Sequence, residues 1–459
     1  MEISFHGADR SVTGSCHRLV CGGRQILIDC GLFQGSRALA EDNAGDFGFD
    51  PAAIDFVVLT HAHLDHCGRL PLLVARGFRG EIVSTAATRD LAQVVLSDSA
   101  HLQEEESQRT YSHSHGHRAP TPPLYTMTDT EHALARFGRV LEYGQVFDLC
   151  PGVRVTAYDA GHILGSASLY FELSEGGHVR TIVMSGDLGN GGRPLLNGPI
   201  APPKADVVVM ETTYGDRLHR PLPQTLEEFY GAVADTHARG GNVVIPTFAL
   251  ERAQEILYYL RVGVEQGRLP SSLTVFLDSP MAILATQAFR DHPEAVAAPV
   301  GRMLERGEDP FAVSGLHLAR DGAASRAINT ISGGAVIMAG SGMCTGGRVM
   351  HHLQHNLARD ACSVIFVGYA AVGTPARRVI DGAQSIRLFG EEVPVRARIY
   401  TINGFSAHAD RDELLAWRAK VGAPRTFLVH GDADVMQKFA SRLTGTAVEL
   451  PEPGQSYPL

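Results

Sequence analysis

Short apolar runs rich in β-branched residues recur along the 459-residue chain, and most of them end at a glycine or a polar residue. Helix-type patterns follow many of these runs. Strands that alternate with helices indicate an α/β architecture. The strands expected on this pattern are Ile54–Thr60, Arg180–Asp187, Ala205–Glu211, Asn242–Pro246, Leu273–Leu277, Ala335–Ala339, Ser363–Val367 and Thr426–His430.

Closely spaced runs in the N-terminal part predict hairpins. Ser15–Val20 is followed at once by Gln25–Asp29, and Arg154–Tyr158 is followed by Ser168–Leu173. Two such runs joined by a short turn are typical of antiparallel neighbours. Part of the N-terminal sheet structure should therefore be antiparallel or mixed.

The charge distribution predicts an inserted domain. Residues 213–396 carry 17 arginines against 18 acidic residues, whereas the whole chain has a net charge of −10. This segment also has its own alternation of strands and helices. We therefore expect residues 1–212 and 397–459 to form one domain and residues 213–396 to form a second domain inserted into it.

The segment His101–Asp129 is the least regular part of the chain. It contains three consecutive glutamates, a histidine-rich run at residues 113–117 and three prolines. Proline-rich polar segments are typical of loops. We expect a surface loop or lid here, and a histidine run in such a loop indicates solvent exposure more readily than a metal site.

The composition places the chain among globular proteins: 44% of its residues are hydrophobic and 20% are charged. The net charge of −10 argues against a protein that holds nucleic acid by bulk positive charge. The seven cysteines are scattered without a C-x-x-C spacing, which favours a reducing compartment. No apolar run is long enough for a membrane span, and the first residues do not resemble a signal peptide, so we expect a cytoplasmic protein without a membrane partner.

The strongest chemical signal lies directly after the expected strand Ile54–Thr60. His61, His63, Asp65 and His66 are four metal-ligand residues within six positions. In an extended chain, residues two positions apart face the same way, so His61 and His63 can bind one metal ion. The following helical turn can direct Asp65 and His66 to a second ion. Imidazole and carboxylate together suit zinc, and manganese or iron as alternatives.

Four residues cannot complete two metal sites, so further ligands should come from other strand ends. His162, Asp187 and His430 each stand where an apolar run breaks at a glycine. Together they would supply one histidine for the first metal, a bridging carboxylate, and one histidine for the second metal.

These motifs resemble the metallo-β-lactamase fold, and more closely its β-CASP ribonuclease branch, which includes the nuclease of eukaryotic pre-mRNA 3′-end cleavage and its bacterial and archaeal relatives. The resemblance covers nearly the whole chain and implies an αββα sandwich with an inserted α/β β-CASP domain. The segments that carry it, besides the histidine block, are Met210–Gly215, Pro246–Ala249, Leu277–Ala282, Gly340–Gly347, Asn403–Asp410 and Leu428–Gly431.

The resemblance also implies roles for single residues. Two zinc ions would be bound, one by His61, His63 and His162 and the other by Asp65, His66 and His430, with Asp187 between them. Asp29 matches the family's first motif and would orient a ligand histidine. A histidine at the position of His430 is typical of the members that cleave RNA, and is usually missing from those that act in DNA repair.

The same comparison implies a hydrolytic mechanism. A pair of metal ions activates water and offsets charge on a phosphoryl group. His408, oriented by Glu211, is the expected acid for the leaving oxygen, and Asp65 could accept a proton from the attacking water. Glycine-rich turns and helix starts are candidates for phosphate contacts, with Thr247 as the expected cap of one helix. These candidates are Ser341, Gly342, Thr374, Arg377, Arg252 and Ser406.

The predicted activity is therefore a two-zinc ribonuclease, an endonuclease and in addition a candidate 5′-exonuclease. An active site between two domains would favour a thin substrate, which points to single-stranded RNA. The alternatives are a zinc-dependent hydrolase of lactones or thioesters, a DNA nuclease, and an RNA-binding subunit without activity. Several β-CASP relatives are dimers, so a homodimer is a further expectation.

Overall fold

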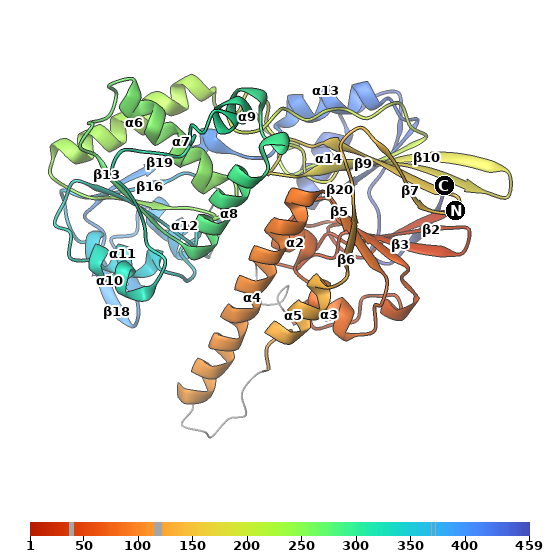
Figure 1. The fold of residues 1–459 in the computed structure, drawn as a ribbon, viewed down its shortest axis with the longest axis horizontal. Helices are drawn as coiled ribbons and strands as arrows, with labels where there is room; N and C mark the ends of the chain where they lie inside the picture. The colour runs from red at the N-terminus through yellow and green to blue at the C-terminus, as the bar shows by residue number, and fades with distance from the viewer. Residues whose placement is uncertain (36–40, 114–121, 369, 372) are drawn as a thin grey trace. The chain divides into compact units, whose positions relative to one another are not determined.

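The computed structural model describes residues 1–35, 41–113, 122–368, 370–371 and 373–459 (Figure 1). The chain forms two compact units. Unit 1 contains Met1–Leu218 and His408–Leu459, and unit 2 contains His219–Ala407. The boundaries expected from the sequence, after residues 212 and 396, lie a short way before these two borders.

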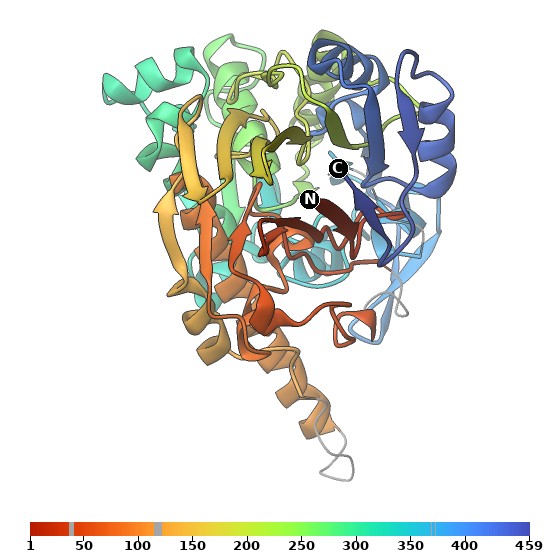
Figure 2. The ribbon, with the colours of Figure 1, turned by 90° about the vertical axis from the view of Figure 1, so that its right-hand side faces the viewer.

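The first sheet of unit 1 is mixed. Its strands are β1 Glu2–Phe5, β2 His17–Cys21, β3 Arg24–Ile28, β4 Phe56–Val58, β5 Glu81–Ser84, β6 Phe137–Val140 and β22 Ser456–Pro458. Within the described residues their spatial order is β22-β1-β2-β3-β4-β5-β6. β22 and β1 to β3 are antiparallel neighbours, and β3 to β6 run parallel. The pairing of β1 with β22 brings the two chain ends together, as Figure 2 shows.

The second sheet of unit 1 is also mixed. Its strands are β7 Val146–Cys150, β8 Val153–Asp159, β9 Ala167–Glu175, β10 His178–Met184, β11 Val207–Glu211, β20 Arg425–Val429 and β21 Ala447–Glu449. The described strands lie in the order β21-β20-β11-β10-β9-β8-β7. β7 to β10 form an antiparallel meander, and β10, β11, β20 and β21 run parallel.

The two sheets of unit 1 pack face to face on one apolar core. Ile26 and Ile28 of β3 and Phe5 of β1 meet Phe171 of β9 and Phe427 of β20 in this core. Burying large apolar side chains between two sheets is a main source of stability in such sandwiches.

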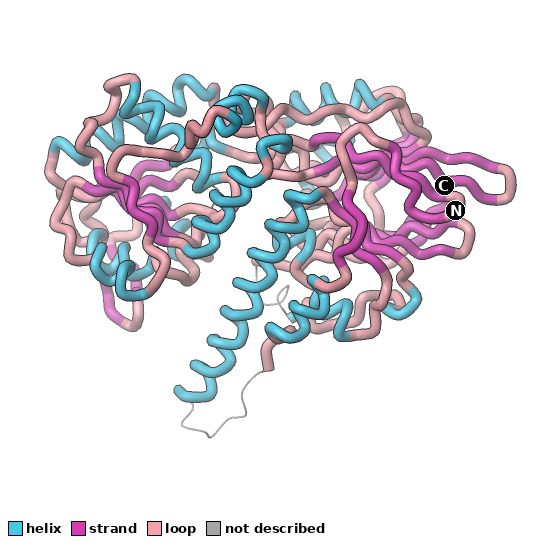
Figure 3. Tube along the Cα trace, viewed as in Figure 1, coloured by secondary structure: helices cyan, strands magenta, loops and turns pink. Residues whose placement is uncertain are grey.

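Helices cover the outer faces of the sandwich (Figure 3). Leu414, Trp417 and Phe439 pack on the outer side of the second sheet. The helices of unit 1 are α2 Leu64–Cys67, α3 Leu70–Ala75, α4 Ala86–His113, α5 Met127–Leu134, α13 Arg411–Val421 and α14 Ala433–Ala440, with the 3₁₀ turn η1 Pro51–Ala53. The arrangement is the expected αββα sandwich.

The expectation of a loop over His101–Asp129 is wrong for much of that segment. Helix α4 continues to His113, and α5 begins at Met127. Residues 86–113 contain no glycine or proline, and alanine, leucine, glutamine and glutamate favour helix there. The histidine-rich run 113–117 lies mostly outside the described residues. In the described part of the chain, no helix is long and apolar enough to cross a membrane.

Unit 2 is a parallel sheet covered by helices. Its strands are β12 Val243–Pro246, β13 Thr274–Asp278, β14 Leu316–Leu318, β15 Ala335–Ala339, β16 Ser363–Phe366 and β19 Arg398–Thr401. The described strands run parallel in the order β14-β13-β15-β12-β16-β19. β12, β15 and β16 are buried along their whole length, as strands covered on both faces should be.

The helices of unit 2 connect these strands. They are α6 Leu222–Ala238, α7 Arg252–Glu265, α8 Pro280–Asp291, α9 Ala298–Glu305, α10 Gly322–Ile328, α11 Val349–Asn356 and α12 Pro375–Ile380, with the 3₁₀ turns η2 Pro293–Ala295 and η3 Asn403–Phe405. β17 Ser385–Leu388 and β18 Glu391–Pro394 form a small antiparallel hairpin. In the sequence, this hairpin lies between α12 and β19. The inserted domain is therefore α/β, as expected.

Candidate metal centre

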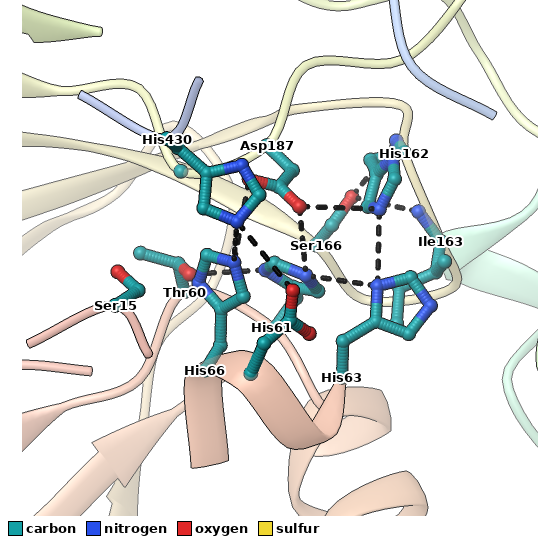
Figure 4. Close-up of polar contacts among 12 residues, drawn as sticks. Ser15, Thr60, His61, His63, His66, His162, Ile163, Ser166, Asp187 and His430 are labelled. Carbon is teal, nitrogen blue, oxygen red and sulfur yellow. Dashed lines mark hydrogen bonds and ion pairs between the residues drawn. The ribbon is translucent and has the colours of Figure 1, made fainter. Parts of the chain in front are cut away.

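The strand ends of both sheets of unit 1 carry the polar residues of one site. His61 and His63 follow β4, and His63 stands directly before α2, which carries Asp65 and His66. Asp187 follows β10, and His430 follows β20. Figure 4 shows the side chains from these separate segments pointing toward one another. The structure thus brings together His66 and His430, which are 364 positions apart in the sequence.

His61, His63, His162 and Asp187 form a first group. The Nε2 atoms of His61 and His162 each lie 3.1 Å from Nδ1 of His63. The same two Nε2 atoms each lie 3.5 Å from Oδ2 of Asp187. All four side chains therefore direct one ligand-type atom toward a common point.

Asp65, His66 and His430 form a second group beside the first. Nε2 of His66 lies 3.3 Å from Nε2 of His430, and Nε2 of His430 lies 3.5 Å from Oδ2 of Asp65. Oδ1 of Asp187 lies 3.3 Å from Nε2 of His66. Asp187 thus turns one oxygen to each group.

The spacing of these atoms fits metal ligation. Two atoms that bind one tetrahedral zinc ion at about 2.0–2.2 Å lie about 3.3–3.6 Å from each other. The distances within the two groups, 3.1 to 3.5 Å, are close to this. Buried imidazole nitrogens packed this tightly around a carboxylate are costly without a cation to bind. The residues present therefore fit a metal cofactor.

The protonation states of the first group suit metal binding. In the second group, burial alone would lower the pKa of His66, but the carboxylates of Asp187 and Asp29 raise it well above its usual value. Burial lowers the pKa of His61 and His162 well below the usual value, and lowers that of His63 to about 4. These three imidazoles are therefore neutral near pH 7, the form that binds a metal. Burial alone would raise the pKa of Asp187, but the imidazoles of His430 and His66 hold it well below its usual range.

Asp29 contacts His66. Its Oδ2 accepts a hydrogen bond from Nδ1 of His66 at 2.7 Å, and its Oδ1 accepts one from the backbone N–H of Thr60 at 2.8 Å. The hydroxyl of Ser15 donates to Oδ2 at 3.2 Å. With a proton fixed on Nδ1, His66 offers the lone pair of Nε2 to the site. The orienting role of Asp29 stays a prediction, and this contact supports it.

Two threonines that the sequence reasoning missed touch ligand-type histidines. The hydroxyl of Thr60 lies 3.1 Å from Nδ1 of His61, and that of Thr213 lies 3.1 Å from Nδ1 of His430. Both stand next to the motifs that drew attention, Thr60 before His61 and Thr213 after Glu211. Their positions were the only available signal, because the partner of Thr213 comes from a distant segment.

Close backbone contacts hold α2 against the end of β3. The N–H of Cys30 donates to the carbonyl of His66 at 2.7 Å. Directly after Cys30, the backbone of Gly31 passes close to α2. A Cβ on Gly31 would lie 1.6 Å from the carbonyl oxygen of Asp65. Only glycine fits at this position. The close packing of Gly31 therefore fixes the position of Asp65 and His66 relative to the end of β3.

His408 and Glu211 form a pair next to the first group. Nδ1 of His408 lies 3.2 Å from Oε1 of Glu211, which also accepts a hydrogen bond from the N–H of Leu188. The His408 ring centroid is 4.4 Å from that of His162. Burial alone would lower the pKa of His408, but the carboxylate of Glu211 raises it to about 9. The imidazole is therefore protonated near pH 7 and can donate a proton.

The phosphate candidates lie in unit 2. Ser341 and Gly342 are in the turn after β15, where the Ser341 hydroxyl accepts a hydrogen bond from the N–H of Thr345. Thr374 caps α12 by accepting from the N–H of Arg377, and Nε of Arg377 donates to Asp381. Helix α11 begins at Val349, after the first of these turns, and α12 begins at Pro375, directly after Thr374.

Other candidates in unit 2 have different surroundings. Arg252 is buried and forms an ion pair with Glu255. The expectation that Thr247 caps this helix is wrong: α7 starts after Glu251, and the Thr247 hydroxyl donates to the carbonyl of Phe248. Ser406 directly follows η3. Phosphate contacts of these residues stay predictions.

An αββα sandwich that gathers imidazoles and carboxylates at the strand ends is the architecture of a metal-dependent hydrolase. Three family descriptions match the chain: the metallo-beta-lactamase superfamily over residues 13–199, the Beta-Casp domain over 253–379, and a Zn-dependent metallo-hydrolase RNA specificity domain over 392–451. The chain belongs to the β-CASP branch of the metallo-β-lactamase superfamily, which confirms the resemblance stated from its motifs.

Two named relatives match all or nearly all of the chain. A protein of Thermus thermophilus called ribonuclease TTHA0252 is 41% identical over 462 residues and is covered completely, as is this chain. The transcription termination factor FttA of Methanocaldococcus jannaschii is 30% identical over 453 residues, which are 96% of this chain and 68% of the relative. A crystal structure of a protein of unknown function from Enterococcus faecalis has a TM-score of 0.57 at 14% identity over 99% of both chains, and shares the fold.

Proposed function

We propose that this protein is a two-zinc ribonuclease that hydrolyses phosphodiester bonds of single-stranded RNA. The observation that carries the proposal is Asp187, whose two oxygens face two separate groups of ligand-type side chains. The name of the Thermus relative and the RNA specificity domain matched by residues 392–451 support RNA as the substrate.

In this proposal the two groups are the two metal sites. His61, His63 and His162 would hold one zinc ion, Asp65, His66 and His430 would hold the other, and Asp187 would bind both. Zinc suits this set of neutral imidazoles and carboxylates, with manganese as the alternative. When bound, the ions would lower the pKa of water and offset the charge on the phosphoryl oxygens.

The chain's own residues move the protons. The His408 imidazolium donates to the leaving oxygen, and Glu211 holds the ring in place and keeps it charged. Asp65 accepts a proton from the attacking water. Because a carboxylate and an imidazolium share the work, bond cleavage needs no separate acid from solvent.

Two other activities fit the same ligands. A hydrolase of lactones or thioesters would need the metal sites but not the Glu211–His408 pair, so that pair argues against it. A DNA nuclease would use the pair as well. His430 argues against DNA, because the family resemblance implies a histidine at this position in the members that cleave RNA and usually another residue in those that act in DNA repair.

The test is cleavage of a 3′-labelled single-stranded RNA and of the DNA oligomer of the same sequence by zinc-loaded protein. We expect cleavage of RNA alone, and no cleavage by His63→Ala. In a second sample labelled at the 5′ end, a ladder of labelled fragments would indicate internal cuts, and immediate release of the labelled mononucleotide would indicate a 5′-exonuclease. If wild type left RNA intact while both zinc ions were bound, the proposal would fail, and cleavage of the DNA alone would favour the DNA nuclease.

The proposal also covers the domain bounds, the location in the cell, the oligomeric state and the RNA contacts. We assign residues 1–212 and 397–459 to the lactamase-type domain and residues 213–396 to the β-CASP insertion. All seven cysteines are free, which supports a cytoplasmic location. We propose a homodimer, whose mass in light scattering would be twice that of a single chain. The residues proposed to contact RNA phosphates are Ser341, Gly342, Thr374, Arg377, Arg252 and Ser406.

A further inference from the structure

The parallel sheet of unit 2 has a point where its connections diverge. β12 and β15 are neighbours in the sheet. The chain leaves β12 through α7 to β13 on one side, and leaves β15 through α11 to β16 on the other side. Because such crossovers are right-handed, these two connections depart over opposite faces of the sheet. Ligands of open α/β sheets bind at the carboxyl ends of the strands at this kind of point.

Phe248 stands at this point. It follows Pro246, the last residue of β12, by two positions, and its side chain is 43% exposed. A single exposed apolar side chain is common on protein surfaces. Its place at the divergence of β12 and β15 is what distinguishes Phe248.

The Phe248 ring packs against two glycines. A Cβ on Gly342, after β15, would lie 3.0 Å from the ring atoms Cδ2 and Cε2. A Cβ on Gly368, after β16, would lie 3.6 Å from Cε2. The ring therefore packs on the backbone that follows β15 and β16, the two strands on either side of β12, and much of its surface stays exposed. Among the described residues, no aromatic ring stacks on it.

Phe389 makes a useful contrast. It is the other exposed phenylalanine of the described chain, with 55% of its surface exposed, and it lies at the turn of the β17–β18 hairpin. His351 stacks on its ring at 4.4 Å between centroids and 19° between planes. One face of Phe389 is therefore already covered by an aromatic partner, whereas Phe248 has no such partner among the described residues.

We infer that Phe248 is a stacking platform for one nucleobase of the RNA. The inference rests on the proposed function, because it needs a single-stranded nucleic acid as the substrate. A flat ring at the surface binds the face of a base without reading its identity. Unstacked bases of single-stranded RNA are commonly held on phenylalanine in this way. The neighbouring turn with Ser341 and Gly342, proposed to contact phosphate, would hold the backbone of the same RNA.

The test compares three variants with wild type. Phe248→Leu removes the ring and keeps an apolar side chain, Phe248→Trp keeps a ring, and Phe389→Leu is the matched control. Loss of one stacked base is worth about 5- to 150-fold in affinity. We expect Phe248→Leu to raise the KM for RNA by such a factor, with the effect on KM rather than on kcat. Phe248→Trp should bind RNA as wild type does, and Phe389→Leu should leave KM unchanged.

A set of RNAs with one abasic position each identifies the stacked base. Affinity is measured in a His63→Ala background so that the RNA stays intact. One abasic position should weaken binding when Phe248 is present and have no further effect in Phe248→Leu. An equal response to all abasic positions in both proteins, or an unchanged KM in Phe248→Leu, would overturn the inference while RNA cleavage by wild type stood. Absence of cleavage by wild type would instead count against the proposed function.

Discussion

Replacing Asp29 by asparagine separates the orientation of His66 from its presence. Asp29 has a φ of 61°, a conformation that asparagine tolerates, so the backbone should keep its path. The carboxylate offers one oxygen to the N–H of Thr60 and the other to Nδ1 of His66. An amide has one oxygen and one NH₂ group, so it cannot accept both bonds.

In Asp29→Asn, it is the hydrogen bond to His66 that must change. The N–H of Thr60 can only donate, so the amide oxygen stays with it and the NH₂ group faces Nδ1 of His66. The proton of His66 must then move to Nε2, the atom that faces Asp187 at 3.3 Å. A protonated Nε2 cannot bind a metal. Changes to such orienting partners typically cost about 10–100-fold in metal affinity. At about 1.4 kcal/mol per tenfold, this is about 1.4–2.8 kcal/mol of binding free energy.

Zinc titration against a chelating dye measures this effect. We expect Asp29→Asn to weaken the zinc site of His66 by this factor and to affect the other site less, because Asp29 reaches His61 only through the hydroxyl of Thr60. Asp206→Asn is the matched control: Asp206 accepts from the N–H and hydroxyl of Thr181 and touches no histidine. Equal zinc affinities in Asp29→Asn and Asp206→Asn would refute the reasoning.

Three further results are expected. Glu211→Gln should move the high-pH limb of the kcat profile to lower pH, because wild-type His408, with its pKa raised to about 9, loses its proton only as the pH rises through that value; an unmoved limb would exclude His408 as the acid. His408→Gln should lower kcat by about 10²–10⁴-fold with zinc content unchanged, measured by metal analysis. Gly31→Ala should lower the free energy of unfolding in urea by about 1–3 kcal/mol through the clash with the Asp65 carbonyl. Gly231→Ala, on the open surface of α6, should be neutral or stabilising by up to about 1 kcal/mol, and equal losses in both glycine variants would contradict the steric argument.

Local pattern was enough to find most strands. β15 has the predicted bounds, and both predicted hairpins, β2 with β3 and β8 with β9, are confirmed. These segments are read well because a buried strand needs a run of apolar residues that a few polar neighbours cannot conceal. Helix α4 was misread because its C-terminal half is polar, and a polar helix lacks the apolar stripe that marks the others.

The site was only partly readable from local pattern. His61, His63, Asp65 and His66 stand together in the sequence, so their common chemistry is visible there. His162 and His430 are remote in the sequence. The break of an apolar run at a glycine marked them as candidates, and the family resemblance assigned each of them to one metal ion. Thr60 and Thr213 were missed because a hydroxyl acquires its partner from tertiary structure. Thr247 looked like a cap, but the helix begins five residues later, at Arg252.

The central claim is that two metal ions held by these seven residues cleave RNA, and metal removal tests it most directly. Protein stripped by a chelator is titrated with zinc while bound zinc and RNA cleavage are followed together. We expect no cleavage by the stripped protein, and full activity only when the second equivalent of zinc binds. We also expect His430→Ala to bind one equivalent tightly and to leave RNA intact. Full activity with a single equivalent, or cleavage by the stripped protein, would contradict the two-metal account.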